Sequence, residues 1–286
     1  MSVKILRDGE FSVLDYKCAA TAADEPFTEI HQRYSLSYVR KGSFGCKTLG
    51  RRFELLAGGL MLGCPDDEFI CTHDHHDGGD ECLSFQLSAE LVDSLGGKLK
   101  TWRIGALPPV AEIAIIAELA QAAACGKTDV GLDEAGIQLV ARFLSLRSDS
   151  HGSRDKVTAH SRRLIVNVAD WIEARSNCSI DLAQSARQAG QSPYHFLRMF
   201  KSVVGVTPHQ HLIRCRLRHA AKRLLEDNAP ITKIALSVGF EDISNFVRSF
   251  HRAAGVSPRT YRQLAATDRN FLQVVRERVG STRRNQ

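Results

Sequence analysis

Residues 192–208 read SPYHFLRMFKSVVGVTP, and residues 242–258 read DISNFVRSFHRAAGVSP. The two segments match at a spacing of 50 residues, and upstream of them an alanine and a glycine recur at a spacing of 49. Such self-similarity indicates a duplicated supersecondary unit. Each copy predicts a helix–turn–helix, the unit that places a helix in a DNA groove. The matching pairs are Ala186 and Ala235, Gly190 and Gly239, Phe196 and Phe246, Phe200 and Phe250, Gly205 and Gly255, and Pro208 and Pro258.

The first copy shows how each unit is expected to fold. Ser192 is suited to cap the longer helix, and Pro193 occupies its first position, where a missing N–H is tolerated. Phe196 and Phe200 lie one turn apart and are expected to pack inward, like the matching phenylalanines of the second copy. The predicted helices span residues 163–175, 181–189 and 193–204, and a connecting helix spans 208–226.

The opposite faces of the two longer helices carry the candidate DNA contacts. Apolar side chains there suit thymine methyl groups, and Arg198 and Arg248 suit the O6 and N7 atoms of guanine. Lys201 and Arg252, one turn further along, suit phosphate. Any one of these positions is equally consistent with an ordinary surface residue. The full candidate set is Ser192, Tyr194, His195, Leu197, Arg198, Lys201, Ile243, Ser244, Asn245, Val247, Arg248 and Arg252.

The connecting helix sets the expected distance between the two units. Its residues 208–226 would extend about 28 Å at 1.5 Å per residue. This length is close to the ~34 Å repeat of B-DNA, so both longer helices are expected to enter successive segments of the major groove.

The charge of the chain is divided unevenly between its halves. Residues 1–150 contain 15 Lys and Arg against 22 Asp and Glu, a net charge of −7, whereas residues 151–286 contain 23 against 10, a net charge of +13. An acidic half joined to a basic half predicts that the C-terminal half alone meets a polyanion.

The N-terminal half predicts strands followed by helices, so the fold class is α+β. Alternating residues at 34–39, 44–49 and 82–87 predict short strands of an antiparallel barrel or sandwich, with turns at Lys41-Gly42 and Gly58-Gly59. Helices are expected over 88–95, 109–124 and 132–146. The predicted domains are a sensory and dimerisation domain at 1–146, a linker at 147–160, a DNA-binding domain at 161–266 and a polar, basic tail at 267–286.

Residues 164–264 resemble the DNA-binding domain of AraC/XylS-type transcriptional regulators. The segments that carry the resemblance are 192–201, 234–240 and 255–258, together with Tyr261. The resemblance implies that two helix–turn–helix units bind promoter DNA and that the protein contacts RNA polymerase. Two positions depart from the family pattern, because Ser185 and Gln191 replace aliphatic or aromatic residues and would weaken the packing of the first unit.

The N-terminal half also resembles the cupin-type sensory domain of many such regulators. The strand pattern, His31 and the glycine-containing turns carry this resemblance. It implies a pocket for an effector, either a small molecule or a metal ion, and dimerisation through the helices between Pro109 and Leu146.

Cysteine and histidine cluster between residues 64 and 82. Thiolate and imidazole together suit zinc or another divalent cation, and side chains two apart on an extended strand point to one side. A metal site, a thiol redox sensor and an ordinary polar loop with packed cysteines all remain open. No cofactor is required by the sequence. The candidate metal ligands are Cys64, Cys71, His73, His75 and Cys82.

These features predict a cytoplasmic, sequence-specific regulator of transcription, not an enzyme, that forms a homodimer. The N-terminus lacks the apolar core of a signal peptide, no apolar run is long enough for a membrane span, and eight cysteines in 286 residues do not suggest a disulfide framework. Two alternatives stay open: a metal-binding β-barrel enzyme with an accessory nucleic-acid module, and an architectural protein that binds DNA without sequence preference.

Overall fold

A computed structural model describes residues 1–73, 79–146 and 157–265. Within them the chain forms two compact units. The first contains residues 1–110, 144–175 and 180–212, and the second contains residues 111–143, 176–179 and, among the described residues, 213–265. These units are groups of residues that pack together in the fold and are not continuous along the sequence. They do not test the predicted domain boundaries, which stay predictions. Most of the predicted linker, the tail and His75 lie outside the described residues.

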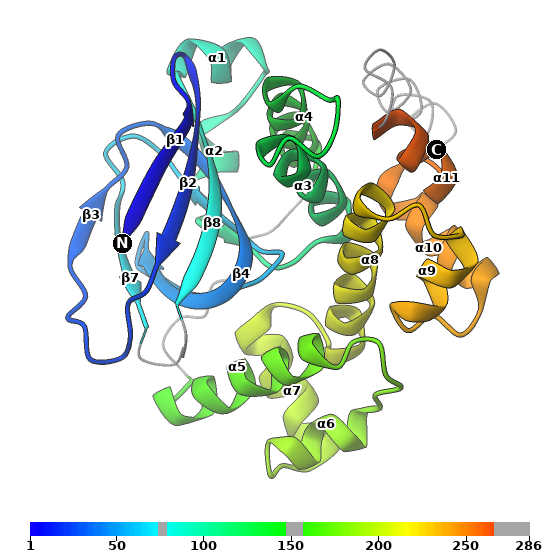
Figure 1. Ribbon diagram of the computed structural model, residues 1–286. Coiled ribbons are helices and arrows are strands. Elements are labelled where there is room, and N and C mark those ends of the chain that lie inside the picture. Colours follow the sequence, from blue (N-terminus) through cyan, green and yellow to red (C-terminus); the bar gives the residue numbers. More distant parts are fainter. Residues whose placement is uncertain (74–78, 147–156, 266–286) are drawn as a thin grey trace. The chain divides into compact units, whose positions relative to one another are not determined.

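The first unit contains an antiparallel β-barrel built around one long strand, β4. The N-terminal part of β4 pairs with β6 and β8, and its C-terminal part pairs with β5 and β7. Strands β1, β2, β8 and β4 lie side by side in the sheet (Figure 1). The strands are β1 Ser2–Arg7, β2 Phe11–Cys18, β3 Thr28–Ile30, β4 Tyr34–Thr48, β5 Arg51–Leu56, β6 Leu60–Gly63, β7 Glu68–Thr72, β8 Asp80–Leu87 and β9 Ala106–Leu107.

The predicted turn at Lys41-Gly42 is wrong, because β4 continues through it. The pairing of β4 with β8 shifts register between Val39 and Lys41 and then continues to Gly42, opposite Asp80. Such a bulge bends a strand without ending it. The single strand thereby joins both parts of the sheet, and the antiparallel barrel with helices confirms the predicted α+β class.

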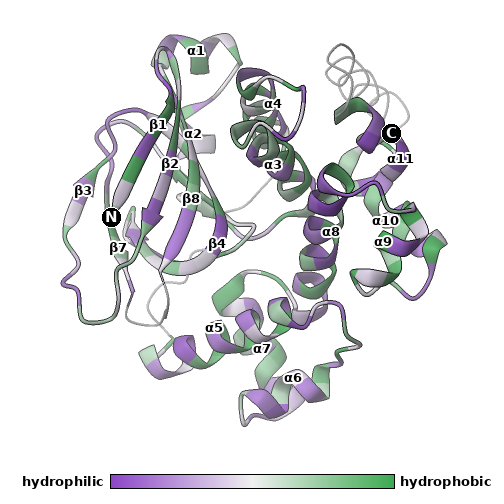
Figure 2. Ribbon diagram, viewed as in Figure 1, coloured by the Kyte–Doolittle hydropathy of each residue, from purple (hydrophilic) through white to green (hydrophobic). Residues whose placement is uncertain are grey.

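The helices whose ranges were predicted match the structure to within a few residues, whereas the short helix α2 was not predicted. In Figure 2, hydrophilic and hydrophobic segments alternate along α5 and α8, as expected for helices with one buried face. The helices are α1 Ala89–Ser94, α2 Leu99–Trp102, α3 Ala111–Ala124, α4 Leu132–Ser145, α5 Ala159–Ala174, α6 Leu182–Gln188, α7 Pro193–Val204, α8 Pro208–Glu226, α9 Ile231–Ser237, α10 Ile243–Ala254 and α11 Pro258–Ala265.

The two helix–turn–helix units use the same local devices. Gly190 and Gly239 have φ angles of 61° and 97°, the left-handed conformation that the tight turns between α6 and α7 and between α9 and α10 require. The paired phenylalanines of α7 and of α10 are fully buried, as predicted. The rings of Phe196 and Phe200 lie 5.5 Å apart, and those of Phe246 and Phe250 lie 5.7 Å apart.

In the second unit, the second helix–turn–helix packs against α3. Tyr261 of α11 is fully buried, and its hydroxyl donates a hydrogen bond of 2.9 Å to the carbonyl of Ile115 in α3. The ring of Tyr261 meets that of Phe250 at 5.4 Å, edge to face. The packing of α10 and α11 is therefore tied to a helix from the N-terminal half of the chain.

The two departures from the family pattern have visible consequences. Ser185 is buried and its hydroxyl donates to the carbonyl of Asp181 at 3.0 Å, so the polar side chain is satisfied by its own helix. The side-chain oxygen of Gln191 is buried, and among the described residues it has no hydrogen-bond partner. At the equivalent place in the second copy, Phe240 is buried and packs against Phe246 at 5.2 Å.

We predict that Gln191→Leu stabilises the protein by about 1–2 kcal/mol, because it removes a buried acceptor that lacks a partner and adds apolar contact. Urea unfolding followed by circular dichroism measures the effect. Gln188→Leu, at an exposed position of α6, is the matched control and should change the free energy of unfolding by less than ~0.5 kcal/mol. Equal gains from both variants would contradict the explanation.

Candidate nucleic-acid interface and barrel cavity

The outer face of α7 carries the first group of predicted DNA contacts. Ser192 caps this helix, and its hydroxyl accepts the backbone N–H of His195 at 3.4 Å. Tyr194 is 75% exposed. Arg198 and Lys201 are also exposed. The helix therefore presents cations and an aromatic ring together.

Leu197 differs from the other candidates on α7. It is half-buried and lines a hollow of about 460 Å³ with Ile172, Ser185 and Leu212. One part of its side chain is therefore exposed to solvent, and the other part packs inside the first helix–turn–helix.

The outer face of α10 carries the second group. Asp242 precedes the helix, and its carboxylate accepts the backbone N–H groups of Ser244 and Asn245 at 2.9 and 3.1 Å. Val247 and Arg248 are exposed beside them. Of the twelve predicted DNA contacts, Leu197 and Ile243 are half-buried and the others are exposed; the exposed ones are Ser192, Tyr194, His195, Arg198, Lys201, Ser244, Asn245, Val247, Arg248 and Arg252.

The barrel encloses a cavity of about 640 Å³. Its walls combine apolar and titratable side chains, among them Tyr16, Glu29, His31 and Phe69. His31 stacks on Phe69 at 4.2 Å, and burial lowers the pKa of this histidine to about 4, so it is neutral near pH 7. Burial also raises the pKa of the Glu29 carboxyl. A cavity of this size and mixed lining can hold a small ligand.

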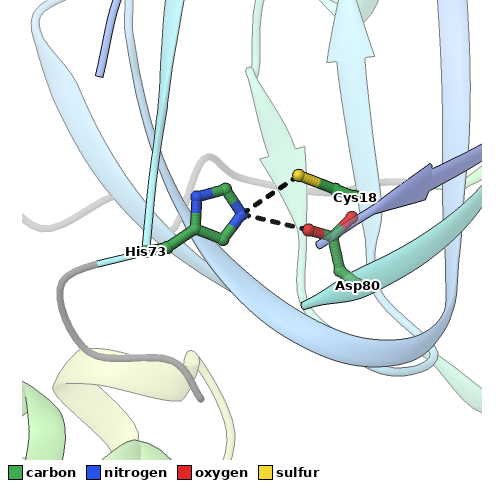
Figure 3. A group of neighbouring side chains, drawn as sticks. All are labelled: Cys18, His73 and Asp80. Carbon is green, nitrogen blue, oxygen red and sulfur yellow. Dashed lines mark hydrogen bonds and ion pairs between the residues drawn. The ribbon is translucent and has the colours of Figure 1, made fainter. Parts of the chain in front are cut away.

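Only part of the predicted metal-ligand set lines this cavity. Cys71, His73 and Cys82 do so, whereas Cys64 lies beside Asp67 and Arg103. His73 instead contacts Cys18 and Asp80; its ring nitrogen Nε2 faces both side chains (Figure 3).

Burial makes several thiols of the barrel weak acids. It raises the pKa of Cys64 to about 11 and that of Cys46 to about 12, and it raises the pKa values of Cys71 and Cys82 strongly as well. Because the thiolate is the reactive form, a raised pKa lowers the reactive fraction of these four thiols near neutral pH.

A buried ion pair connects the barrel to the first helix–turn–helix inside the first unit. Arg162 of α5 donates to Glu54 of β5 at 3.1 Å, and their side chains are 2% and 0% exposed. Arg52 lies 3.6 Å from the same carboxylate oxygen. Leu56, at the end of β5, belongs to the same hydrophobic cluster as Ile165 and the paired phenylalanines of α7.

Sequence reasoning did not identify these partners. Cys18 lies far from the cysteine–histidine cluster, and the β2–β8 register alone places it opposite Asp80. Glu54 and Arg162 are separated by 108 residues, so no local pattern joins them. Asp242 could have been recognised, because an aspartate just before a helix is a favourable cap.

In the part of the chain that the structure describes, every helix is too short or too polar to span a lipid bilayer.

Comparisons with known proteins agree with the helix–turn–helix geometry. A family model described as a helix-turn-helix domain matches residues 185–264. The transcriptional activator AarP from Providencia stuartii is 30% identical over 124 residues, which cover 43% of this chain and 91% of AarP. The multiple antibiotic resistance protein MarA from Escherichia coli is 31% identical over 113 residues, which cover 40% of this chain and 84% of MarA.

Among solved structures, the C-terminal domain of AraT, a response regulator from Geobacillus stearothermophilus, aligns with 37% of this chain and 89% of its own length. The identity is 28% and the TM-score is 0.35. The similarity to AarP and MarA spans most of those two proteins. The chain therefore belongs to the AraC/MarA-type family of DNA-binding transcriptional regulators.

Proposed function

We propose that this regulator reads promoter DNA with α7 and α10 and that an effector in the barrel cavity modulates its activity. The exposed cations of both helices and the net charge of +13 over residues 151–286 support the first part. Arg198 and Arg248 would contact guanine, and Lys201 and Arg252 would contact phosphate.

The buried pair of Glu54 and Arg162 is the observation that carries the second part. Two charges removed from water are held in place only while each keeps its partner. A ligand that shifts β5 therefore acts directly on α5, the first helix of the DNA-binding half. Thiol oxidation is the less favoured signal, because four of the buried thiols are weak acids.

A short row of the sheet leads to this pair from β7, a strand that also contributes Phe69 and Cys71 to the cavity wall. Gly45 of β4 stands opposite Glu54 of β5 on one side and Thr72 of β7 on the other. A Cβ atom at Gly45 would lie 2.4 Å from the Thr72 hydroxyl and 3.4 Å from the Glu54 carboxylate. Only glycine allows these two side chains to converge over β4.

We further propose a homodimer that recruits RNA polymerase at the promoter. The helix α3 is largely buried in its own unit, so α4 is the more accessible candidate for dimer contacts in the region 109–146. Sedimentation equilibrium tests the dimer, and a monomer at all concentrations would contradict it.

Transcription with purified polymerase tests recruitment, and an unchanged transcript level would contradict that.

Selection of binding sites from random duplex DNA tests the function itself. The full chain should enrich one sequence and bind it at least about 10³-fold more tightly than unrelated DNA. Equal affinity for all duplexes would identify an architectural protein without sequence preference and would overturn the proposal.

Arg248→Ala should lower the affinity for the selected site by about 1–3 kcal/mol and relax the preference at one base pair. Arg252→Ala is the matched control on the same helix, and it should weaken binding to all sequences and reduce the salt dependence. Competition binding against single-base variants of the site separates the two patterns. A uniform loss with Arg248→Ala would place this residue on phosphate.

A double-mutant cycle tests the buried ion pair. Arg162→Met should lower the free energy of unfolding by about 3–5 kcal/mol, because it deprives the buried Glu54 of its main partner. Adding Glu54→Leu should restore part of that loss, since the buried carboxylate is then gone while Arg52, 15% exposed, loses its neighbour. Urea unfolding measures the wild type, Arg162→Met, Glu54→Leu and the double variant, and Arg187→Met, on the exposed face of α6, is the control. Simple addition of the two single effects would show that the pair is not coupled.

A further inference from the structure

Three side chains with different donor atoms meet at one end of the barrel cavity. Cys18 ends β2, Asp80 begins β8, and the two residues stand opposite each other in the β2–β8 register. His73 follows directly after β7. All three line the cavity, and they are the group among the described residues whose sulfur, nitrogen and oxygen atoms lie within 4.8 Å of one another (Figure 3).

The spacing of these atoms fits a single small cation. The Cys18 sulfur lies 3.7 Å from His73 Nε2, which lies 3.1 Å from Asp80 Oδ2. Bond lengths of 2.0–2.3 Å at tetrahedral angles place ligands of one zinc ion roughly 3.3–3.6 Å apart. The two observed distances lie on either side of that range, and the remaining distance, from the Cys18 sulfur to an Asp80 oxygen, is within 4.8 Å, so side-chain movements would bring three ligands to one ion and leave a fourth position open.

Burial and orientation also suit a metal ion. The side chains of His73 and Asp80 are only 9% and 8% exposed, and a buried carboxylate is stabilised by a bound cation. The thiol of Cys82 donates to the other carboxylate oxygen of Asp80 at 3.6 Å. Such an outer contact fixes the orientation of a metal-binding carboxylate.

An ion can reach this group from outside the barrel. Cys18 and Asp80 also line an outer groove of about 390 Å³, together with Glu81, Lys17 and Lys41. Cys18 and Asp80 thus line both the outer groove and the inner cavity, whereas His73 lines the inner cavity. A mixed set of sulfur, nitrogen and oxygen ligands favours zinc over magnesium or calcium.

We propose that Cys18, His73 and Asp80 bind one zinc ion and that this ion is an effector of the regulator. The second half of this statement rests on the proposed function, whereas the binding site stands without it. His73 is adjacent to Thr72, which converges with Glu54 over Gly45. Closing the three ligands around zinc therefore pulls on the row of the sheet that ends at Glu54, the partner of Arg162 in α5.

Metal analysis of the purified full chain tests the site. Protein prepared with zinc should retain close to one equivalent after gel filtration, and chelator-treated protein should take up one equivalent in a calorimetric titration. Cobalt in place of zinc should add a thiolate-to-metal absorption band. Protein that binds neither ion under these conditions would overturn the site.

Variants identify the ligands. Cys18→Ser and His73→Gln should each weaken zinc binding by at least about 100-fold, at or beyond the upper end of what loss of an outer contact causes. Cys64→Ser is the matched control, because Cys64 is a buried barrel thiol beside Asp67 and Arg103. Circular dichroism confirms that each variant is folded. Full binding in folded Cys18→Ser, or loss of binding in Cys64→Ser, would overturn the ligand set.

DNA binding separates the two halves of the proposal. Zinc should change the affinity of the wild-type chain for its selected site by at least about 5-fold and leave that of Cys18→Ser unchanged. An equal affinity with and without bound zinc would overturn the effector assignment. Zinc uptake by a chain that has no preferred DNA sequence would instead overturn the proposed function and leave the metal site intact.

Discussion

The pairing of Arg162 with Glu54 is the constraint on which the first unit depends. A guanidinium and a carboxylate from positions 108 residues apart are both removed from water, and neither charge is tolerated there alone. Apolar contacts such as that of Leu56 with the helix–turn–helix core strengthen the junction. The charges determine which residue faces which, because a hydrophobic contact is not directional and an ion pair is.

The barrel contributes to this junction through a single strand. Because β4 pairs with β5, β6, β7 and β8, it is shared by the walls of the cavity and by the strand that carries Glu54. Ligand-binding side chains and the contact with α5 therefore lie on neighbouring strands of one sheet. A sheet of paired strands is stiff, so a displacement at one strand is transmitted to the next more readily than through a loop.

The sequence predicted the helical units well because their determinants are local. A polar cap (Ser192 in the first unit, Asp242 in the second), a glycine turn and two phenylalanines one turn apart define each unit within about twenty residues. The barrel was predicted only as a class. A turn expected at Lys41-Gly42 proved to be a bulge, since pairing with β8 outweighed the local preference of the glycine. The partnership of Cys18 with His73 and Asp80 depends on strand register, which local spacing does not reveal.

The hydrogen bond from Tyr261 to Ile115 has a practical consequence for anyone who divides this chain. A fragment that starts after the acidic half would keep the phenol and lose its acceptor, together with the apolar cover that α3 provides. An isolated C-terminal fragment would thus expose, on α10 and α11, an apolar surface that contains the hydroxyl of Tyr261, separated from the Ile115 carbonyl. Low solubility of such a fragment would reflect the place of the cut and would say nothing about the intact molecule.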